Sequence, residues 1–316
     1  MIHELADGIW SCEQDDGPRI VRQVVVAGDD AVLVVDTGLP GAPSADLLPL
    51  VARLGRREVA VLISHPDSDH LGGTAELLAA EPAARVLAGA LDLPLVGDPE
   101  RMIRERYARF AVHDDVPFGT AASERARSRA GRPFAGARAA DPGVRLELGG
   151  RTVELVPTPG HSPGHVAAWI PDAGLLAAGD AVMGNGIPTR DGGLLIPPMY
   201  APPAVYRATI ERVRALSPRV LASGHELVLR DDDVGAFLDA SRAACERLAA
   251  LVAAALDEAP RTLLELCGRV HGEYGGLPDE RVADLALTVD GHLADLIAAE
   301  LAVVTSDNPR RFRSRA

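Results

Sequence analysis

The segment His65-Pro-Asp-Ser-Asp-His-Leu-Gly-Gly73 follows the apolar run Val59-Ala-Val-Leu-Ile63, and this combination decides the fold. Four side chains that can bind metal lie within six residues, where a buried strand is expected to end: His65, Asp67, Asp69 and His70. In an extended segment, alternation places the first three on one side and turns His70 away. Imidazole and carboxylate ligands suit Zn, Fe or Mn better than Ca or Mg. The segment therefore predicts two adjacent cations.

Further candidate ligands follow apolar runs elsewhere in the chain. His161 lies in Thr158-Pro-Gly-His-Ser-Pro-Gly-His165, Asp180 ends Leu175-Leu-Ala-Ala-Gly-Asp180, and His225 ends Val220-Leu-Ala-Ser-Gly-His225. Upstream, Asp36 ends the run Val32-Leu-Val-Val-Asp36. Open α/β folds place their ligands at the carboxyl ends of strands. A polar surface turn would explain the first cluster alone, but the ordered set predicts that these side chains converge at one edge.

The ordered set resembles the metallo-β-lactamase superfamily. The signature of that family is an Asp-ended strand, then H-x-H-x-D-H, a Gly-His, a Gly-Asp and a final His, and the resemblance covers about residues 1–230. It implies an α/β fold, namely an αββα sandwich. It also implies that one metal is held by His65, Asp67 and His161, a second by Asp69, His70 and His225, and that Asp180 bridges them. Asp36 and His165 would lie behind the ligands and orient them.

Asp67 stands where the family usually has histidine, so the motif here is H-x-D-x-D-H. With three Asp ligands instead of two, the net charge of two divalent ions and a hydroxide falls to about zero. The added oxygen donor moves the metal preference from Zn, the metal implied by the family, toward Fe or Mn. Flavin-linked di-iron members and the competence-protein branch carry similar substitutions. The alternative in which Asp67 is a surface residue and only one metal binds stays open.

Composition is typical of a soluble, cytoplasmic enzyme. The 316 residues allow one large domain and a smaller one, with neither a membrane-spanning run nor the pattern of a signal peptide. The three cysteines are far apart and fit buried thiols in a reducing compartment. The chain has no lysine, which excludes Schiff-base chemistry, a pyridoxal-linked lysine and a P-loop.

The charge of the chain argues against nucleic-acid binding. Its formal net charge is −13, whereas nucleic-acid binding usually needs a basic stripe that displaces counterions. The densest basic stretch runs from Arg125 to Arg138. This stretch either steers an anionic substrate or forms a solvated helix or loop face.

Hydrophobic periodicity predicts a catalytic domain at residues 1–233 and a helical tail at residues 234–316. Residues 99–142 interrupt the alternation and predict a lid-like insertion, with a helix around residues 100–110 and then a Gly/Ala/Arg-rich stretch. The other expected elements are hairpins at 20–36 and 144–156, strands at 59–63 and 85–88, and helices at 44–54 (capped by Ser44), 71–80 and 203–216.

The tail predicts helices at 234–256, 262–270 and 279–301, the second capped by Thr262, followed by a β-ribbon of 302–305 with 311–314. Its order and spacing resemble the winged-helix-type tail of one branch of the superfamily. That branch includes an endoribonuclease and esterase- and thioesterase-like hydrolases. Because the first tail helix and the two residues after it carry Glu246, Asp257 and Glu258 in an acidic chain, we expect the tail to pack over the active-site face or to form a homodimer.

The site predicts a metal-dependent hydrolase. Two cations with a shared hydroxide generate a nucleophile near neutral pH and polarise the attacked oxygen. The catalytic residues would be Asp69, which orients the hydroxide and transfers a proton, and bridging Asp180. The segments 184–190 and 196–203 are expected to shape the pocket. They and the following helix supply candidate substrate contacts, each of which packing explains as readily: Asn185, Arg190, Tyr200 and Tyr206.

The segment Pro159-Gly-His-Ser-Pro-Gly-His165 resembles glyoxalase-II-like and thioesterase-like members of the superfamily. We therefore expect hydrolysis of an ester, thioester or lactone of a small or carrier-linked metabolite. Three alternatives stay open. They are a single-strand nuclease or phosphodiesterase, a di-iron redox or oxygen-using enzyme favoured by Asp67, and a non-catalytic metal-stabilised binding module.

Overall fold

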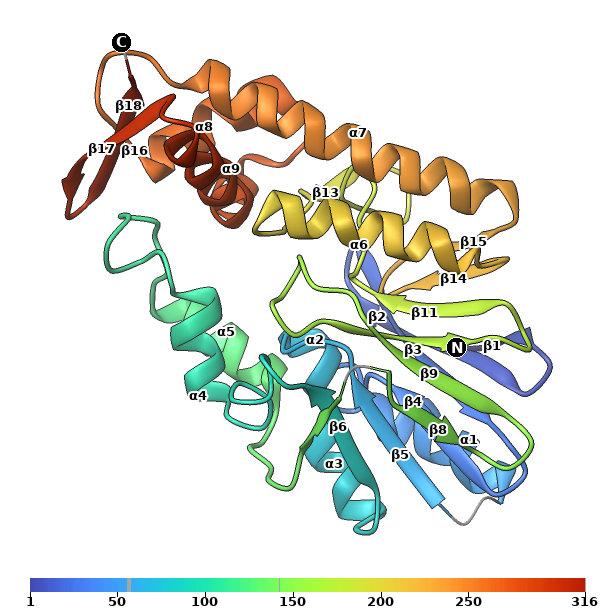
Figure 1. Ribbon diagram of the computed structural model, residues 1–316. Coiled ribbons are helices and arrows are strands. Elements are labelled where there is room, and N and C mark those ends of the chain that lie inside the picture. Colours follow the sequence, from blue (N-terminus) through green and yellow to red (C-terminus); the bar gives the residue numbers. More distant parts are fainter. Residues whose placement is uncertain (56–57, 142, 316) are drawn as a thin grey trace.

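Two β-sheets pack face to face between two layers of helices in the computed structural model of the chain (Figure 1). The structure describes residues 1–55, 58–141 and 143–315. Helices α1 (Leu48–Leu54) and α3 (Thr74–Ala80) cover the outer face of the first sheet, and α6 (Pro203–Leu216) covers that of the second. This arrangement confirms the αββα sandwich that the resemblance implies.

The first sheet supplies the edge from which the principal motif leaves. Strands β1 to β4 are antiparallel, which confirms the hairpin expected at 20–36, whereas β4 to β7 are parallel. Strands β4 and β5 are buried except at Glu58, as expected for parallel strands covered on both faces. The strands are β1 (Ile2–Ala6), β2 (Ile9–Asp16), β3 (Arg19–Ala27), β4 (Ala31–Val35), β5 (Glu58–Ile63), β6 (Arg85–Gly89) and β7 (Arg138–Ala140).

The second sheet supplies the opposite side of the site. Strands β11 and β14 are parallel neighbours, and the hairpin expected at 144–156 is present as β8 and β9. Leu33 and Leu62 of the first sheet share a core with Leu155, Ala168 and Ala177 of the second. Burying this apolar surface holds the two sheets together. The strands are β8 (Arg145–Glu147), β9 (Thr152–Pro157), β10 (Val166–Ile170), β11 (Leu175–Gly179), β14 (Val220–Ser223) and β15 (Val228–Arg230).

Two expected helices differ from the structure beside the first sheet. The helix expected at 44–54 begins as the π-helical turn η1 (Pro43–Leu47), and the Ser44 hydroxyl donates to Glu76 instead of capping the helix. The helix expected at 71–80 is divided into α2 (Ser68–Leu71) and α3. At the break, a β-carbon on Gly72 would collide with the backbone oxygen of Arg129. Gly72 and the following Gly73 therefore permit a close backbone approach at the point where α2 ends.

The insertion at 99–142 contains more regular structure than the sequence predicts. The helix expected around 100–110 is present as α4 (Pro99–Met102) and the π-helical η2 (Ile103–Tyr107). Its Gly/Ala/Arg-rich part forms α5 (Thr120–Ala130) and then β7, which extends the first sheet. Figure 1 shows α4 and α5 beside the sandwich and below the tail. A function as a lid stays a prediction.

The tail packs on α6 and the second sheet. Leu248 and Leu266 of the tail share a core with Ile210 and Leu221. The expected β-ribbon is confirmed as β17 and β18, and β16 extends it, whereas the helix expected at 279–301 is 3₁₀-helical η3 and then α9. The winged-helix interpretation stays a prediction. The elements are α7 (Asp232–Ala255), β16 (Arg261–Thr262), α8 (Leu263–Tyr274), η3 (Asp279–Leu285), α9 (Ala286–Ala298), β17 (Ala302–Asp307) and β18 (Arg310–Ser314).

Two features complete the architecture. The short strands β12 (Ile187–Pro188) and β13 (Leu194–Ile196) form a separate hairpin, which follows β11 and precedes α6 in the chain. Across the described ranges, the helices are all too short or too polar to traverse a lipid bilayer.

The cap of α8 gives a stability prediction for the tail. Thr262 Oγ1 accepts from the Glu265 amide at 3.2 Å, and Glu265 Oε2 accepts from the Thr262 amide at 2.7 Å. Replacing Thr262 with alanine removes one half of this capping box, so we expect the free energy of unfolding to fall by about 1 kcal/mol. Urea denaturation measures the loss. Thr262→Ser retains the hydroxyl and should lose much less; equal losses in the two variants would contradict a capping role.

Candidate metal centre

The predicted ligands gather at one edge of the sandwich, where strands of both sheets end. Asp36 follows β4 and the segment His65–His70 follows β5. Asp180 follows β11, His225 follows β14, and His161 lies in the loop between β9 and β10. The fold therefore brings together side chains that are far apart in the sequence: Asp36 and His225, for example, are 189 positions apart.

The motif segment is not extended throughout, so the expected alternation is wrong. Asp67 has an extended backbone (φ −81°, ψ 144°), but α2 begins at the next residue. The carbonyl of Asp67 accepts from the His70 amide at 2.9 Å. This helical turn brings Asp69 and His70 into one ligand group with His225.

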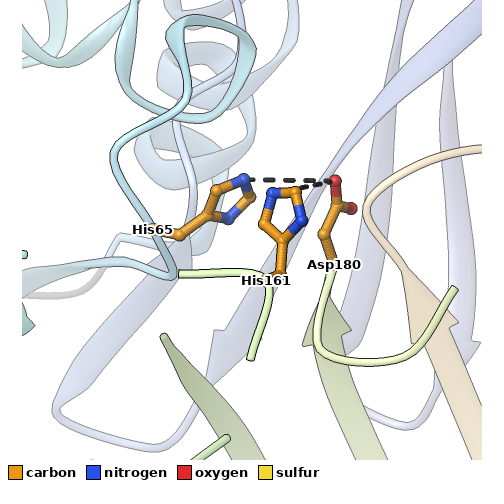
Figure 2. A group of neighbouring side chains, drawn as sticks. All are labelled: His65, His161 and Asp180. Atoms are coloured by element: carbon orange, nitrogen blue, oxygen red, sulfur yellow. Dashed lines mark ion pairs between the residues drawn. The ribbon is translucent and has the colours of Figure 1, made fainter. Parts of the chain in front are cut away.

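Two groups of side chains each place their ligand atoms within 4.8 Å of one another: His65, His161 and Asp180, and Asp69, His70 and His225. Figure 2 shows Asp180 facing the rings of His65 and His161. Asp180 Oδ2 lies 3.9 Å from His161 Nε2 and 3.4 Å from His225 Nε2. The carboxylate thus lies between the groups, in the position expected of a bridging ligand.

The four ligand histidines are oriented by hydrogen bonds on their outer nitrogens. His161 Nδ1 donates to the Met199 carbonyl at 2.8 Å, and His225 Nδ1 donates to the Ile20 carbonyl at 2.9 Å. His70 Nδ1 bonds Asp36 and His65 Nδ1 bonds the Ser64 hydroxyl. Metal-binding histidines are held in this way, with the second nitrogen facing the ion. The arrangement therefore presents four Nε2 atoms to one region.

The hydrogen bonding of two of these Nε2 atoms indicates whether the residues fit a metal ion. Those of His65 and His70 are buried and have no hydrogen-bond partner within the described part of the chain. Buried polar atoms are nearly always paired, so an unpaired one needs an explanation. A divalent ion accepts such lone pairs, and imidazole with carboxylate is a normal donor set for it. The residues present therefore fit a metal centre.

Asp36 supports His70 from behind, as the resemblance implies. Its carboxylate accepts from the Ser64 amide at 2.7 Å, from the Ser64 hydroxyl at 2.8 Å and from His70 Nδ1 at 2.7 Å. Burial alone would lower the pKa of His70, but the carboxylates of Asp36 and Asp180 raise it to about 10. Asp36 itself has a left-handed backbone (φ 62°), which is uncommon outside glycine.

His165 is not itself a candidate ligand and lies behind those residues, as expected. Its ring stacks on His65 with centroids 5.1 Å apart, and its Nε2 accepts from the Asp180 amide at 3.2 Å. Thr158 Oγ1 bonds the opposite nitrogen at 2.8 Å. Burial lowers the pKa of His165 well below its usual value. A neutral ring that accepts from the backbone thus fixes where Asp180 leaves β11.

Asp67 belongs to neither group, although its Oδ2 lies 2.9 Å from His161 Nε2 and 3.3 Å from His65 Nε2. Arg106 of the insertion binds both of its oxygens, with Nη2 2.7 Å from Oδ2. Burial would raise the pKa of Asp67, but Arg106 holds it well below the usual range. Asp67 thus contacts the first group and is at the same time the partner of an arginine.

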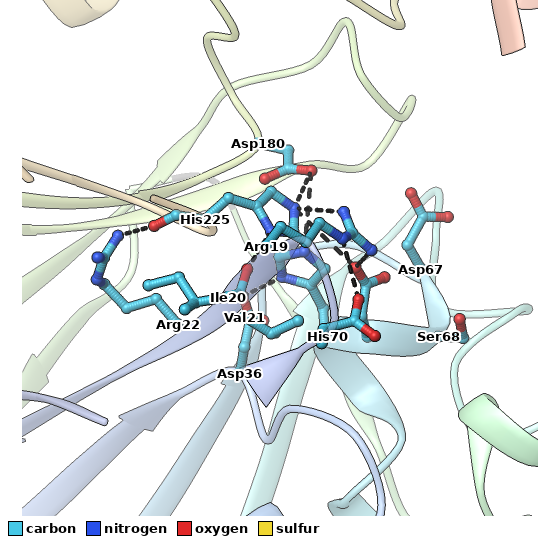
Figure 3. Close-up of polar contacts among 12 residues, drawn as sticks. Arg19, Ile20, Val21, Arg22, Asp36, Asp67, Ser68, His70, Asp180 and His225 are labelled. Atoms are coloured by element: carbon cyan, nitrogen blue, oxygen red, sulfur yellow. Dashed lines mark hydrogen bonds and ion pairs between the residues drawn. The ribbon is translucent and has the colours of Figure 1, made fainter. Parts of the chain in front are cut away.

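Asp69 also has an arginine partner. Arg19 Nη2 lies 2.6 Å from Asp69 Oδ2, and Arg19 Nε lies 3.0 Å from Asp16. Figure 3 shows the Arg19 guanidinium beside the ring of His225. Burial would raise the pKa of Asp69, but Arg19 and the neighbouring imidazoles lower it. The carboxylate of Asp69 is therefore ionised at neutral pH.

Several functional side chains were missed by sequence reasoning. Arg22 donates to the carbonyls of Ser223 and Leu227, both at 3.0 Å, and to that of His225, so it shapes the loop that carries the ligand (Figure 3). Asp92 accepts from the Ser162 hydroxyl and the Gly164 amide beside His161. None of these contacts has a local sequence signal, because the partners are at least 70 positions apart.

A cavity of about 630 Å³ opens in front of the ligand groups. Asp67, Asp69 and Asp180 reach its inner end, and both the insertion and the tail contribute to its wall. Its apolar wall includes Val116, Phe118, Leu195, Met199 and Leu287. Its charged wall includes Asp16, Arg19, Arg106, Arg109, Arg125, Arg129, Glu280 and Asp284.

The expected substrate contacts lie outside this cavity wall, as far as the described residues define it. Tyr200 and Tyr206 are completely buried, with stacked rings 4.2 Å apart in the core beneath the tail. Arg190 pairs with Asp15 at 2.9 Å, and the Asn185 carbonyl accepts from Tyr274. The flanking segments do contribute Ile187, Ile196 and Met199, but packing accounts for the two tyrosines.

Curated relatives cover most of the chain. This chain is 30% identical over 239 residues to the hydroxyacylglutathione hydrolase of Acidiphilium cryptum. The matched region spans 74% of this chain and 79% of the relative. The chain is 28% identical over 290 residues to the protein of the same name from Rhodobacter capsulatus, with 90% of each chain covered.

Solved structures show the same fold over the full length. A metallo-β-lactamase family protein from Thermus thermophilus matches with a TM-score of 0.74 at 23% identity, covering 99% of this chain and 100% of the other. A β-lactamase domain protein from Burkholderia ambifaria matches with a TM-score of 0.73 at 18% identity, covering 99% and 93%. The family model of the metallo-β-lactamase superfamily matches residues 16–225. This chain belongs to the metallo-β-lactamase superfamily.

Proposed function

We propose that the protein is a metal-dependent hydrolase that cleaves the thioester bond of a small acyl thioester. The observation that carries the proposal is the convergence of four histidine Nε2 atoms around Asp180 at the inner end of the cavity. The relatives named hydroxyacylglutathione hydrolase support the thioester over other acyl bonds. Ester and lactone hydrolysis use the same chemistry and differ only in the leaving group.

The ligand groups supply sites for two divalent ions. His65, His161 and Asp180 would hold one, with Asp67 close enough to join them, and Asp69, His70 and His225 would hold the other. When bound, such ions lower the pKa of a water molecule and polarise a carbonyl oxygen. Imidazole and carboxylate suit Zn, and the additional carboxylate of Asp67 also suits Fe or Mn.

The protein residues orient the reactants. Asp69 is ionised at the inner end of the cavity, so its free lone pairs can accept a proton from the attacking water and pass it to the leaving thiolate. The apolar wall formed by Val116, Phe118 and Leu287 would contact the acyl group and exclude bulk water. The charged wall, which contains both signs, would contact the polar part of the thioester.

Phosphodiester cleavage of nucleic acid fits the cavity less well. Its wall carries Asp16, Glu105, Glu280 and Asp284 in addition to the ligand carboxylates. The arginines of the same wall partly offset these groups, but the net charge of −13 repels a polyanion. A small thioester presents less charge to the same surface.

Turnover of an acyl-glutathione thioester tests the proposal. We expect hydrolysis by metal-loaded protein and a loss in kcat/KM of about 100-fold or more in Asp180→Asn, because this variant weakens both ligand groups. Thiol release measured with a disulfide dye follows the reaction. Asp239→Asn, an exposed side chain on α7 with 73% exposure, should behave as the unaltered protein. Persistent turnover in Asp180→Asn, or turnover of oligonucleotides only, would contradict the proposal.

The tail contributes indirectly to the orientation of His161. Thr288 Oγ1 donates to the Pro198 carbonyl at 2.8 Å and accepts from the Tyr200 amide at 3.1 Å. Between these residues, the Met199 carbonyl accepts from His161 Nδ1. A side chain on α9 therefore fixes the backbone that fixes a metal ligand. We propose that Thr288 is a positioning residue for His161.

Replacing Thr288 tests this role without a turnover assay. Thr288→Val preserves shape but removes both hydrogen bonds, so we expect metal affinity to fall by about tenfold. Competition with a coloured chelator gives the dissociation constant. Thr288→Ser keeps the hydroxyl and should bind metal as tightly as the unaltered protein. Equal affinity in the valine variant would show that packing alone holds the loop.

A further inference from the structure

Arg19 and Arg106 make equivalent contacts with the two ligand groups. Arg106 Nη2 lies 2.7 Å from Asp67 Oδ2 and 2.9 Å from His161 Nε2. Arg19 Nη2 lies 2.6 Å from Asp69 Oδ2, and its Nη1 lies 3.3 Å from His225 Nε2. Each guanidinium thus joins one carboxylate to one imidazole at the inner end of the cavity.

The two imidazoles can accept these contacts only through the lone pair that a metal ion needs. His161 Nδ1 faces the Met199 carbonyl and His225 Nδ1 faces the Ile20 carbonyl. A carbonyl oxygen only accepts, so both Nδ1 atoms carry hydrogen, and each Nε2 of the neutral ring has a single lone pair. An arginine nitrogen lies 3.3 Å from His225 Nε2 and 2.9 Å from His161 Nε2, which is also 2.9 Å from Asp67 Oδ2. One lone pair cannot accept from an arginine and coordinate an ion at the same time.

Charge leads to the same conclusion. Arg19 and Arg106 have side chains only 11% and 13% exposed, so water screens them little. Without another cation, each guanidinium neutralises a buried carboxylate that would otherwise be unpaired. Beside a divalent ion, the same guanidinium would be a like charge at close range.

We propose that Arg19 and Arg106 are internal counter-cations that hold the two ligand groups in the absence of metal and are displaced into the cavity when metal binds. Both side chains already line the cavity, which offers the space into which they would move. Arg19 also remains attached through Nε to Asp16, at 3.0 Å.

The pairing of Asp67 with Arg106 further explains the departure from the family motif, because a histidine at position 67 could not neutralise a buried arginine.

Chemical labelling of the unaltered protein tests the displacement directly. Phenylglyoxal modifies accessible guanidinium groups, and peptide mass spectrometry gives the rate at each arginine. We expect Arg19 and Arg106 to react faster after Zn²⁺ or Mn²⁺ is added to chelator-treated protein. Arg127 pairs with Glu100 on the exposed surface of the insertion, so its rate should not change. Unchanged rates, or protection by metal, would overturn the proposal.

Metal titration of charge-removing variants provides a second test. Arg106→Met removes the competitor, so the affinity for one metal equivalent should rise by about tenfold or more. Arg104→Met, on the same helix but 66% exposed, is the matched control and should leave the affinity unchanged. Weaker or equal binding by Arg106→Met would mean that the arginine supports the site and would overturn the proposal.

These measurements stay informative if a variant is unstable or the proposed substrate is wrong. If Arg106→Met does not fold without metal, the labelling of the unaltered protein decides. Neither measurement uses turnover, so thioester hydrolysis could fail while the displacement holds. Conversely, active protein whose arginines do not respond to metal would retain the proposed function and lose only this inference.

Discussion

The compensation of buried negative charge at one edge of the sandwich is the constraint on which the site depends. Asp67, Asp69 and Asp180 are almost completely buried, and an unpaired carboxylate in such surroundings is strongly destabilising. Arg106, Arg19 and the imidazoles hold their pKa values low despite burial. The same negative cluster that the arginines neutralise would also attract divalent ions.

Support for the ligands comes from distant parts of the chain. Asp36 fixes His70 from the end of β4, and Arg22 of β3 holds the loop of His225. The Met199 carbonyl orients His161, and Thr288 of the tail holds the loop that contains Met199. Each of these three candidate ligands is therefore oriented by a group that belongs to another element. This interdependence makes the metal centre a property of the complete fold, tail included.

The candidate ligand groups and much of the cavity wall come from different regions. The two sheets supply the ligand groups, whereas the insertion and the tail supply much of the cavity wall. Arg106 is the exception, because it lies in the insertion yet contacts Asp67 and His161. A change in the insertion can therefore alter metal binding as well as substrate fit. The departure at position 67 is best understood together with this arginine, which no local motif indicates.

Local sequence determined the strands that precede the motif residues, the order of the candidate ligands and the Thr262 cap, because periodicity and capping depend on residues a few positions apart. Asp36 and His165 could likewise be assigned from the motif. The tertiary structure alone decided the break of the motif helix at Gly72, the burial of Tyr200 and the arginine partners of Asp67 and Asp69. These features depend on which surfaces meet: Arg19 reaches Asp69 across 50 positions, and Gly72 approaches the backbone of a helix in the insertion. Only packing specifies such contacts.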